Sequence, residues 1–139
     1  MEEAREKMLS RAAIGARERA YAPYSGFRVG AALLGESGRV YLGCNIENAA
    51  YSPTNCAERT AFFKAVSEGE RDFVAIAIAG GSGEEPTELC PPCGVCLQVM
   101  TEFCNPDGFE VYLVKSPDEW KRLTLAELLP YGFSKEKLK

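Results

Sequence analysis

Three cysteines and one glutamate have the spacing of a zinc site that performs chemistry. Cys56 stands two residues before Glu58, and Cys93 and Cys96 form a Cys-x-x-Cys pair further along the chain. Three thiolates can hold a zinc ion and leave its fourth position for water. The pattern therefore predicts one Zn²⁺ per chain, bound by Cys56, Cys93 and Cys96. Glu58 is too close to Cys56 in sequence to bind the same ion easily, but it is placed to move protons beside the ion, as a catalytic acid–base group.

Other interpretations of these residues remain open from spacing alone. With Cys90 the pair becomes Cys-x-x-Cys-x-x-Cys, which resembles the start of an iron–sulfur motif, although Cys104 follows too late for the usual fourth ligand. A closed structural zinc site with Cys90 as fourth ligand also fits, but such a site has no need of Glu58. Glu58 alone would be read as a residue that complements a helix dipole. Cys44 and Cys104 are expected to be small buried hydrophobic residues.

Composition limits the classes of protein that fit. The 139 residues suit one domain, expected over residues 1–139, and the apolar fraction of 46% is that of an ordinary globular protein. No apolar run is long enough for a membrane helix, and Met1 to Arg5 lack the apolar centre of a signal peptide, so we expect a cytoplasmic protein. The net charge is −4 and no basic stripe is present, so nucleic acid is not expected as a partner.

The absence of histidine narrows the chemistry further. Any zinc must be held by sulfur or carboxylate, and a carboxylate must take the place of the commonest general base. The six cysteines are not expected to form disulfides in a reducing cytosol. A small neutral molecule is the expected substrate.

Hydrophobic periodicity predicts helices and strands in alternation. Helices are expected at residues 2–21, 55–68, 93–103 and 123–129, the last capped by Thr124, and strands at 27–34, 40–46, 73–79 and 109–114. The first two strands form a hairpin whose runs are apolar on both faces, which is typical of strands that helices cover on each side. Residues 80–85 are expected to be a glycine-rich loop. The order predicts an α/β fold, a three-layer α/β/α sandwich with a mixed β-sheet.

Both cysteine motifs fall at expected helix starts. There the unpaired backbone N–H groups and the helix dipole favour thiolates. Three thiolates and one Zn²⁺ carry a net charge of −1. Arg59 follows Cys56 by three residues, on the same helix face, so it is expected to balance part of this charge.

Longer blocks of the chain resemble the small cytidine deaminases. The blocks are Ala22–Ala32, Gly43–Tyr51, Cys56–Arg59, Pro92–Cys96 and Leu128–Phe133, which follow one another in the family's order and span nearly the whole chain. The zinc motif is that of the zinc deaminases, with Cys56 in place of the usual histidine. The resemblance implies hydrolytic deamination of cytidine and deoxycytidine to uridine and deoxyuridine with release of ammonia, a reaction of pyrimidine salvage.

The resemblance also implies roles for matching residues. Asn45 and Glu47 would bind ribose hydroxyls, Phe27 would pack on the base or sugar, and the backbone of Ala57 would contact the pyrimidine carbonyl. Family members of this size are homotetramers with sites at subunit contacts, so three further residues would reach a neighbouring site: Ala49, Tyr51 and Phe133. Spacing alone would not have assigned any of these roles, because the aromatic residues could be core and the polar ones loop residues.

One position departs from the family pattern. The family usually reads Cys-Arg-Gln after the second motif, and this chain reads Cys96-Leu97-Gln98. A positive charge near the sulfurs is therefore missing. Two other functions remain as alternatives: a related aminohydrolase that acts on a nucleoside antibiotic, and a non-catalytic structural zinc or iron–sulfur protein.

Overall fold

A single five-stranded sheet organises the chain. The computed structural model describes residues 2–86 and 89–138. The strands lie in the order β2-β1-β3-β4-β5. β3 and β4 are parallel, and the other neighbouring strands are antiparallel. The strands are β1 Arg28–Gly35, β2 Val40–Cys44, β3 Phe73–Gly81, β4 Glu110–Ser116 and β5 Glu119–Thr124.

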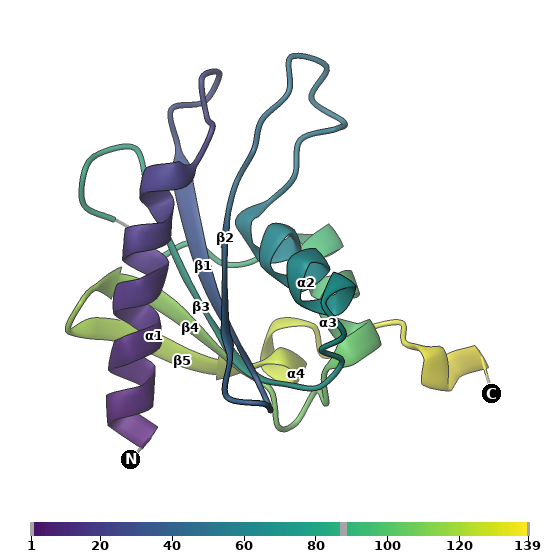
Figure 1. Cartoon of the computed structure of the whole chain (residues 1–139). Helices are drawn as coiled ribbons and strands as arrows, with labels where there is room; N and C mark the ends of the chain where they lie inside the picture. The colour runs from purple at the N-terminus through teal and green to yellow at the C-terminus, as the bar shows by residue number, and fades with distance from the viewer. Residues whose placement is uncertain (1, 87–88, 139) are drawn as a thin grey trace.

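Helices cover both faces of this sheet. α1 lies on one face, and α2 and α3 lie together on the other (Figure 1). The predicted α/β fold with a mixed sheet between helices is therefore confirmed. The helices are α1 Glu2–Ala16, α2 Ala57–Ser67, α3 Gly94–Phe103 and the short α4 Leu125–Leu128, with 3₁₀ turns at Arg17–Arg19 and Lys135–Leu138. No helix in the described ranges is both long and apolar enough to cross a bilayer.

Alternate residues of the central strands build two separate cores. In β3, Ile76 and Ile78 face α2 and α3, whereas Ala75, Ala77 and Ala79 face α1. Successive side chains of a strand point to opposite faces, so a strand that is apolar throughout serves both cores. This is the pattern expected for a sheet with helices on each side.

The core under α1 is made of small residues. Leu9 and Ala13 of the helix pack on the alanines of β3. At Gly30 a side chain would meet the backbone of Ala13 and Arg17, at 2.1 and 2.7 Å, so only glycine permits this approach of helix and strand. The alanine-rich N-terminal helix therefore packs unusually close to the sheet.

The core under α2 and α3 is aromatic. Phe62 of α2 lies 5.0 Å from Phe73 between ring centroids and 6.4 Å from Phe103. Phe109 and Met100 are also buried in this cluster. The first turn of α2 nevertheless packs closely on the sheet, because an added Cβ at Gly43 of β2 would lie 2.3 Å from the Ala57 carbonyl oxygen.

Several predicted boundaries were wrong. The first helix ends at Ala16 and not at Tyr21, because the chain tightens into the 3₁₀ turn before Pro23. Residues 80 and 81 belong to β3 and not to a loop, since they pair with Val29 and Arg28. The strand β5 was not predicted at all, and it contains the position where the last helix was expected to begin. Thr124 does cap that helix, through a capping box with Glu127.

The expectation that both hairpin strands are covered on each face holds for β1 and fails for β2. β2 pairs with β1 alone and forms one edge of the sheet. Its central residue, Leu42, is 42% exposed. The side chain of Lys64 donates a hydrogen bond to the backbone carbonyl of Leu42. A lysine at an exposed edge is a common protection against pairing with another strand.

Candidate metal centre and the pocket at Glu47

Two helix N-termini bring the cysteines together. Cys56 is the N-cap residue of α2 and Cys93 the N-cap residue of α3, and both have extended backbones. The Cys93 sulfur accepts a hydrogen bond from the backbone N–H of Cys96, at 3.4 Å. Unpaired N–H groups and the positive ends of both helix dipoles favour thiolates at these positions. The sequence prediction that both motifs lie at helix starts is confirmed.

The three sulfur atoms have the separation that a zinc ion requires. The Sγ atoms of Cys56, Cys93 and Cys96 all lie within 4.8 Å of one another, and those of Cys56 and Cys93 are 3.7 Å apart. Tetrahedral zinc with Zn–S bonds of about 2.3 Å needs sulfurs ~3.8 Å apart. Cys96 is buried, Cys56 is half-buried and Cys93 is exposed. The donor set therefore fits zinc and opens toward the surface on one side, where a fourth ligand can enter.

Arg59 is the nearest cation to this cluster among the contacts of the described residues. Its Nη2 atom donates a hydrogen bond to the Cys56 sulfur, at 3.2 Å. Hydrogen bonds from Cys96 and Arg59 lower the pKa of the Cys56 thiol to about 5. Cys56 is therefore prepared to bind a metal as a thiolate at neutral pH.

Glu58 lies in the first turn of α2 and is only 4% exposed. Burial raises the pKa of its carboxyl to about 7, and the negative charge of the Cys56 thiolate adds to the shift. Within the described ranges, Glu58 is not one of the residues whose ligand atoms cluster with the sulfurs. A carboxyl with a pKa near 7 can both accept and donate a proton at neutral pH, which is what an acid–base group must do.

The remaining cysteines do not join the cluster. Among the described residues it contains three sulfurs, and Cys90 is not one of them. Cys90 packs instead beside Phe27 against Gly80, where an added Cβ would lie 3.0 Å from the Cys90 sulfur. Cys104 is a buried core residue, as expected. Cys44 is only half-buried, at the end of the edge strand β2, so the expectation that it is a buried residue was wrong.

Leu97 is 8% exposed and belongs to the aromatic core under α3. The residue that departs from the family pattern therefore contributes packing, and Arg59 approaches the sulfurs from α2.

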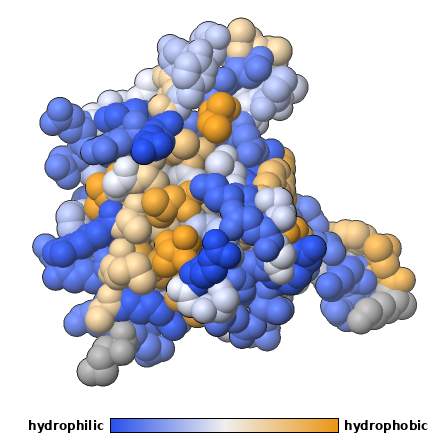
Figure 2. All heavy atoms as spheres, in the orientation of Figure 1, coloured by the Kyte–Doolittle hydropathy of each residue, from blue (hydrophilic) through white to orange (hydrophobic). Residues whose placement is uncertain are grey.

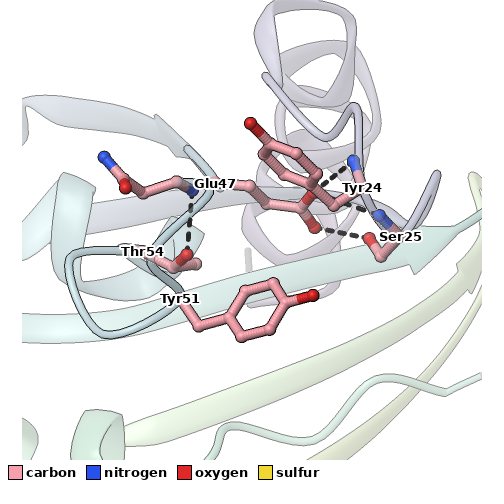
Figure 3. A pocket seen from close by; sticks show the side chains of 6 residues that line it. Tyr24, Ser25, Glu47, Tyr51 and Thr54 are labelled. Atoms are coloured by element: carbon pink, nitrogen blue, oxygen red, sulfur yellow. Dashed lines mark hydrogen bonds between the residues drawn. The ribbon is translucent and has the colours of Figure 1, made fainter.

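A pocket opens near the predicted ribose-binding residues (Figure 3). Its volume is about 370 Å³, and it is lined by Tyr24, Ser25, Glu47, Asn48, Tyr51 and Thr54. Glu47 lies between the turn at Tyr24 and Ser25 and the loop that carries Tyr51. Tyr51 has a left-handed backbone, with φ of 64°, which is uncommon for a bulky residue and occurs often at functional sites.

The other predicted substrate residues lie outside this pocket's lining. Asn45 is buried, and its amide already links β1 to β2: Oδ1 accepts from the Val29 N–H at 2.9 Å, and Nδ2 donates to the Phe27 carbonyl at 2.8 Å. Phe27 packs against the aromatic core. Ala57 is fully buried in the first turn of α2. The structure thus places Asn45, two residues before Glu47, in direct contact with Phe27.

Two residues that were expected to reach the site of a neighbouring subunit are exposed to solvent in this chain. Ala49 is exposed in the loop before Tyr51, and Phe133 is 58% exposed. Residues 130–138 stand away from the body of the molecule (Figures 1 and 2). Gln98 and Thr101 both donate to the Phe133 carbonyl in this segment, at 2.6 and 3.4 Å.

Sequence reasoning did not single out Tyr24, Ser25 or Thr54, although all three line the pocket. Thr54 accepts a hydrogen bond from the Asn48 N–H at 3.0 Å and so shapes the loop. The sequence feature that could have drawn attention to Tyr24 and Ser25 is the Pro-Tyr-Ser-Gly turn just before β1. A turn of this kind gives no sign of which distant side chain it will contact.

Comparison with known proteins agrees with this geometry. A family model described as the cytidine and deoxycytidylate deaminase zinc-binding region matches residues 3–109. That range contains both cysteine motifs and Glu58.

Individual relatives match over most of their length. The cytidine deaminase of Sporosarcina psychrophila is 58% identical over 123 residues, which cover 88% of this chain and 87% of the relative. That of Halalkalibacterium halodurans is 54% identical over 130 residues, or 94% of this chain and 95% of the relative. The crystal structure of cytidine deaminase from Burkholderia pseudomallei superposes with a TM-score of 0.81 at 47% identity, covering 91% of this chain and 97% of that chain.

Proposed function

Because the chain belongs to the cytidine and deoxycytidylate deaminase family, we propose that it converts cytidine and deoxycytidine to uridine and deoxyuridine with release of ammonia. The observation that carries this function is a cluster of three cysteine sulfurs within 4.8 Å of one another, beside the buried Glu58. The cluster alone would suit a structural zinc site. The buried carboxyl with its raised pKa is what favours an enzyme.

Cys56, Cys93 and Cys96 would hold the zinc ion, which would supply Lewis-acid activation of a water molecule at neutral pH. Glu58 would accept a proton from the attacking water and pass it to N3 of the pyrimidine. After the water oxygen has bonded to C4, Glu58 would accept the remaining proton of the new C4 hydroxyl and give it to the amino group, which leaves as ammonia when the C4–N bond breaks. One carboxyl can serve all these steps, because its pKa near 7 allows it to cycle between both forms.

The nucleoside would be held beside these groups by residues on neighbouring segments. Phe27 would pack against the base or sugar, and the backbone of Ala57 would contact the pyrimidine carbonyl. Asn45 and Glu47 would bind sugar hydroxyls. Support comes from the contact between Asn45 and Phe27 and from the pocket in front of Glu47. Because both amide ends of Asn45 are already used within the chain, Glu47 is the stronger candidate for the sugar.

The exposed aromatic residues support assembly into a homotetramer. Tyr131 is 98% exposed and Phe133 is 58% exposed, in a segment that packs little against its own chain. We infer that Phe133, Tyr51 and Ala49 complete the site of a neighbouring subunit. Such an assembly would cover apolar surface that is costly to leave in water.

Sedimentation and truncation test the assembly. A protein that ends after Leu129 should lose association and most of its activity, while the melting transition of the remaining chain changes little. A truncated protein that keeps full specific activity would contradict the role of the segment. So would a full-length protein that is active as a dilute monomer.

The location proposed for this enzyme is the cytoplasm. Six free cysteines, three of which must remain thiolates to bind zinc, favour a reducing compartment. Nucleic acid is not proposed as a substrate, because the chain has a net charge of −4 and the one charged residue that lines the described pocket is Glu47.

The alternatives are less well supported. A structural zinc or iron–sulfur protein would have no use for Glu58 or for the pocket at Glu47. An aminohydrolase for a nucleoside antibiotic would share the metal chemistry, so that a substrate panel must exclude it.

The direct test follows the loss of cytidine absorbance with purified, zinc-loaded protein. Cytidine and deoxycytidine should both be consumed, and free cytosine should be a poor substrate because it lacks the sugar. A protein that turns over neither nucleoside would contradict the proposed function. A marked preference for a modified nucleoside over both would favour the second candidate.

A further inference from the structure

The side chain of Glu47 is held by an unusual number of donors. Its Oε1 atom accepts from the backbone N–H groups of Tyr24 and Ser25, at 3.0 and 3.2 Å. Its Oε2 atom accepts from the hydroxyl of Ser25, at 2.5 Å. All three donors belong to one turn directly before β1 (Figure 3). The carboxylate is therefore fixed in orientation although it faces an open pocket.

The direction of the Ser25 hydroxyl is also fixed. Its oxygen accepts from the backbone N–H of Phe27, at 3.0 Å. A hydroxyl has a single proton, and an N–H can only donate, so that proton must point to Glu47. Ser25 thus joins the aromatic residue proposed for the base or sugar to the carboxylate proposed for the sugar.

The backbone of Glu47 is held in another way. Its N–H donates to the Tyr21 carbonyl at 2.8 Å, and the Tyr21 N–H donates to the Asn45 carbonyl at 2.9 Å. These bonds do not involve Ser25. Removal of the Ser25 hydroxyl should therefore release the carboxylate and leave the loop that carries it in place.

The Glu47 carboxylate can accept few further hydrogen bonds. An ionised carboxylate offers about four acceptor positions, and three of the Glu47 positions are occupied within the chain. The hydrogen bond from Ser25 lowers the pKa of Glu47, so the group is an acceptor only. One position is left for a donor in the pocket, and a sugar hydroxyl is such a donor.

We propose that Ser25 is a positioning residue that directs the remaining acceptor position of Glu47 at one ring hydroxyl of the nucleoside sugar. This inference rests on the proposed function, because it requires a nucleoside in the pocket. It predicts that Ser25 affects recognition of the sugar and has no part in the reaction at C4.

A second serine–glutamate pair, Ser37 and Glu70, can serve as a control for Ser25 and Glu47. Ser37 donates to Glu70 at 2.5 Å and accepts from the Arg39 N–H at 3.3 Å, in the turn between β1 and β2. This pair repeats the local bonding of Ser25 but does not line the pocket. A purely structural serine should behave as Ser37 does.

The test compares three variants with two substrates. Ser25→Ala, Ser25→Thr and Ser37→Ala are assayed with cytidine and with 2′,3′-dideoxycytidine, which lacks both ring hydroxyls. Ser25→Ala should raise KM for cytidine by roughly tenfold, the effect expected when a hydrogen bond to a charged group is lost. Its kcat, its zinc content and its KM for the dideoxy analogue should remain those of the parent protein.

The other variants separate positioning from stability. Ser25→Thr retains a hydroxyl and should restore most of the affinity for cytidine. Ser37→Ala should lower the melting temperature as Ser25→Ala does, without a change in either KM. Equal increases of KM for both substrates in Ser25→Ala, or a Ser25→Ala protein that matches Ser37→Ala, would overturn the inference and leave the proposed function standing. A parent protein without cytidine turnover would overturn both.

Discussion

Glu6 and Glu58 are both buried, one on each side of the sheet, but their surroundings differ. Glu6 of α1 is 8% exposed, and both of its oxygens have partners: Trp120 donates at 2.8 Å and Arg122 at 3.3 Å. Glu58 of α2 is 4% exposed, and burial raises its pKa to about 7. The contacts of Glu6 tie its side chain to β5 and leave neither oxygen free of a partner. A buried carboxyl beside thiolates can change its charge, which is a requirement for proton transfer.

The two faces differ in a second respect. On the α1 face one helix packs along small side chains, so no two helix ends meet there. On the other face α2 and α3 begin at the same edge, and each carries a cysteine as its N-cap residue. Metal ligands from two distant parts of the chain therefore converge on the second face. Substitutions on the α2 and α3 face are therefore expected to change zinc binding and turnover, whereas substitutions on the α1 face are expected to change stability alone.

The largest effect is expected from the sulfur ligands. Cys56→Ala, Cys93→Ala and Cys96→Ala should each lose zinc, lose deamination and lower stability, because the free energy of metal binding is partly free energy of folding. Metal analysis and turnover on the same sample check this. Cys90→Ala is the control and should retain both zinc and turnover, since Cys90 lies outside the cluster. Loss of zinc from the control would point to a four-sulfur site.

A smaller effect, confined to stability, is expected on the α1 face. Leu9 is fully buried against the alanines of β3. Leu9→Ala should lower the free energy of unfolding by about 2–5 kcal/mol, through lost burial and the cavity that remains. Denaturant titration measures this. The specific activity of the folded fraction should be unchanged, and a parallel loss of kcat would mean that the two faces are coupled.

The smallest effect is expected from Glu6. Glu6→Gln keeps the hydrogen bond from Trp120 and removes the charge that pairs with Arg122, whose side chain is 51% exposed. The expected cost is about 1 kcal/mol of folding free energy. Turnover and zinc content should equal those of the parent protein. A loss of several kcal/mol would mean that Glu6 organises more of α1 than its two contacts indicate.

Local signals explain which parts of the molecule the sequence could predict. Helix starts at Cys56 and Cys93 follow from spacing and capping, which are properties of a few neighbouring residues. The two central strands were recognisable because their runs are apolar throughout. The chemistry of the metal site depends on residue types within these local motifs, so the ligands and Glu58 could be named before the structure.

Features that depend on distant contacts could not be predicted. The strand β5 reads Glu-Trp-Lys-Arg-Leu-Thr, and its charged residues resemble a surface loop until β4 provides a partner for its backbone. The contact between Ser25 and Glu47 joins residues 22 positions apart. The amide of Asn45 bridges two strands, which no local pattern indicates. These are long-range contacts, and they decide how the substrate pocket is shaped.

The central claim is that Glu58 carries protons and does not hold the structure together. Turnover and zinc content measured on one preparation of Glu58→Gln test this most directly, with Glu6→Gln as the matched buried control. The variant keeps the size and polarity of the side chain but cannot exchange a proton. Zinc should remain at one ion per chain, the fold should be intact, and kcat should fall by at least roughly 10²–10⁴-fold. Near-normal turnover in a fully zinc-loaded Glu58→Gln protein would contradict the account.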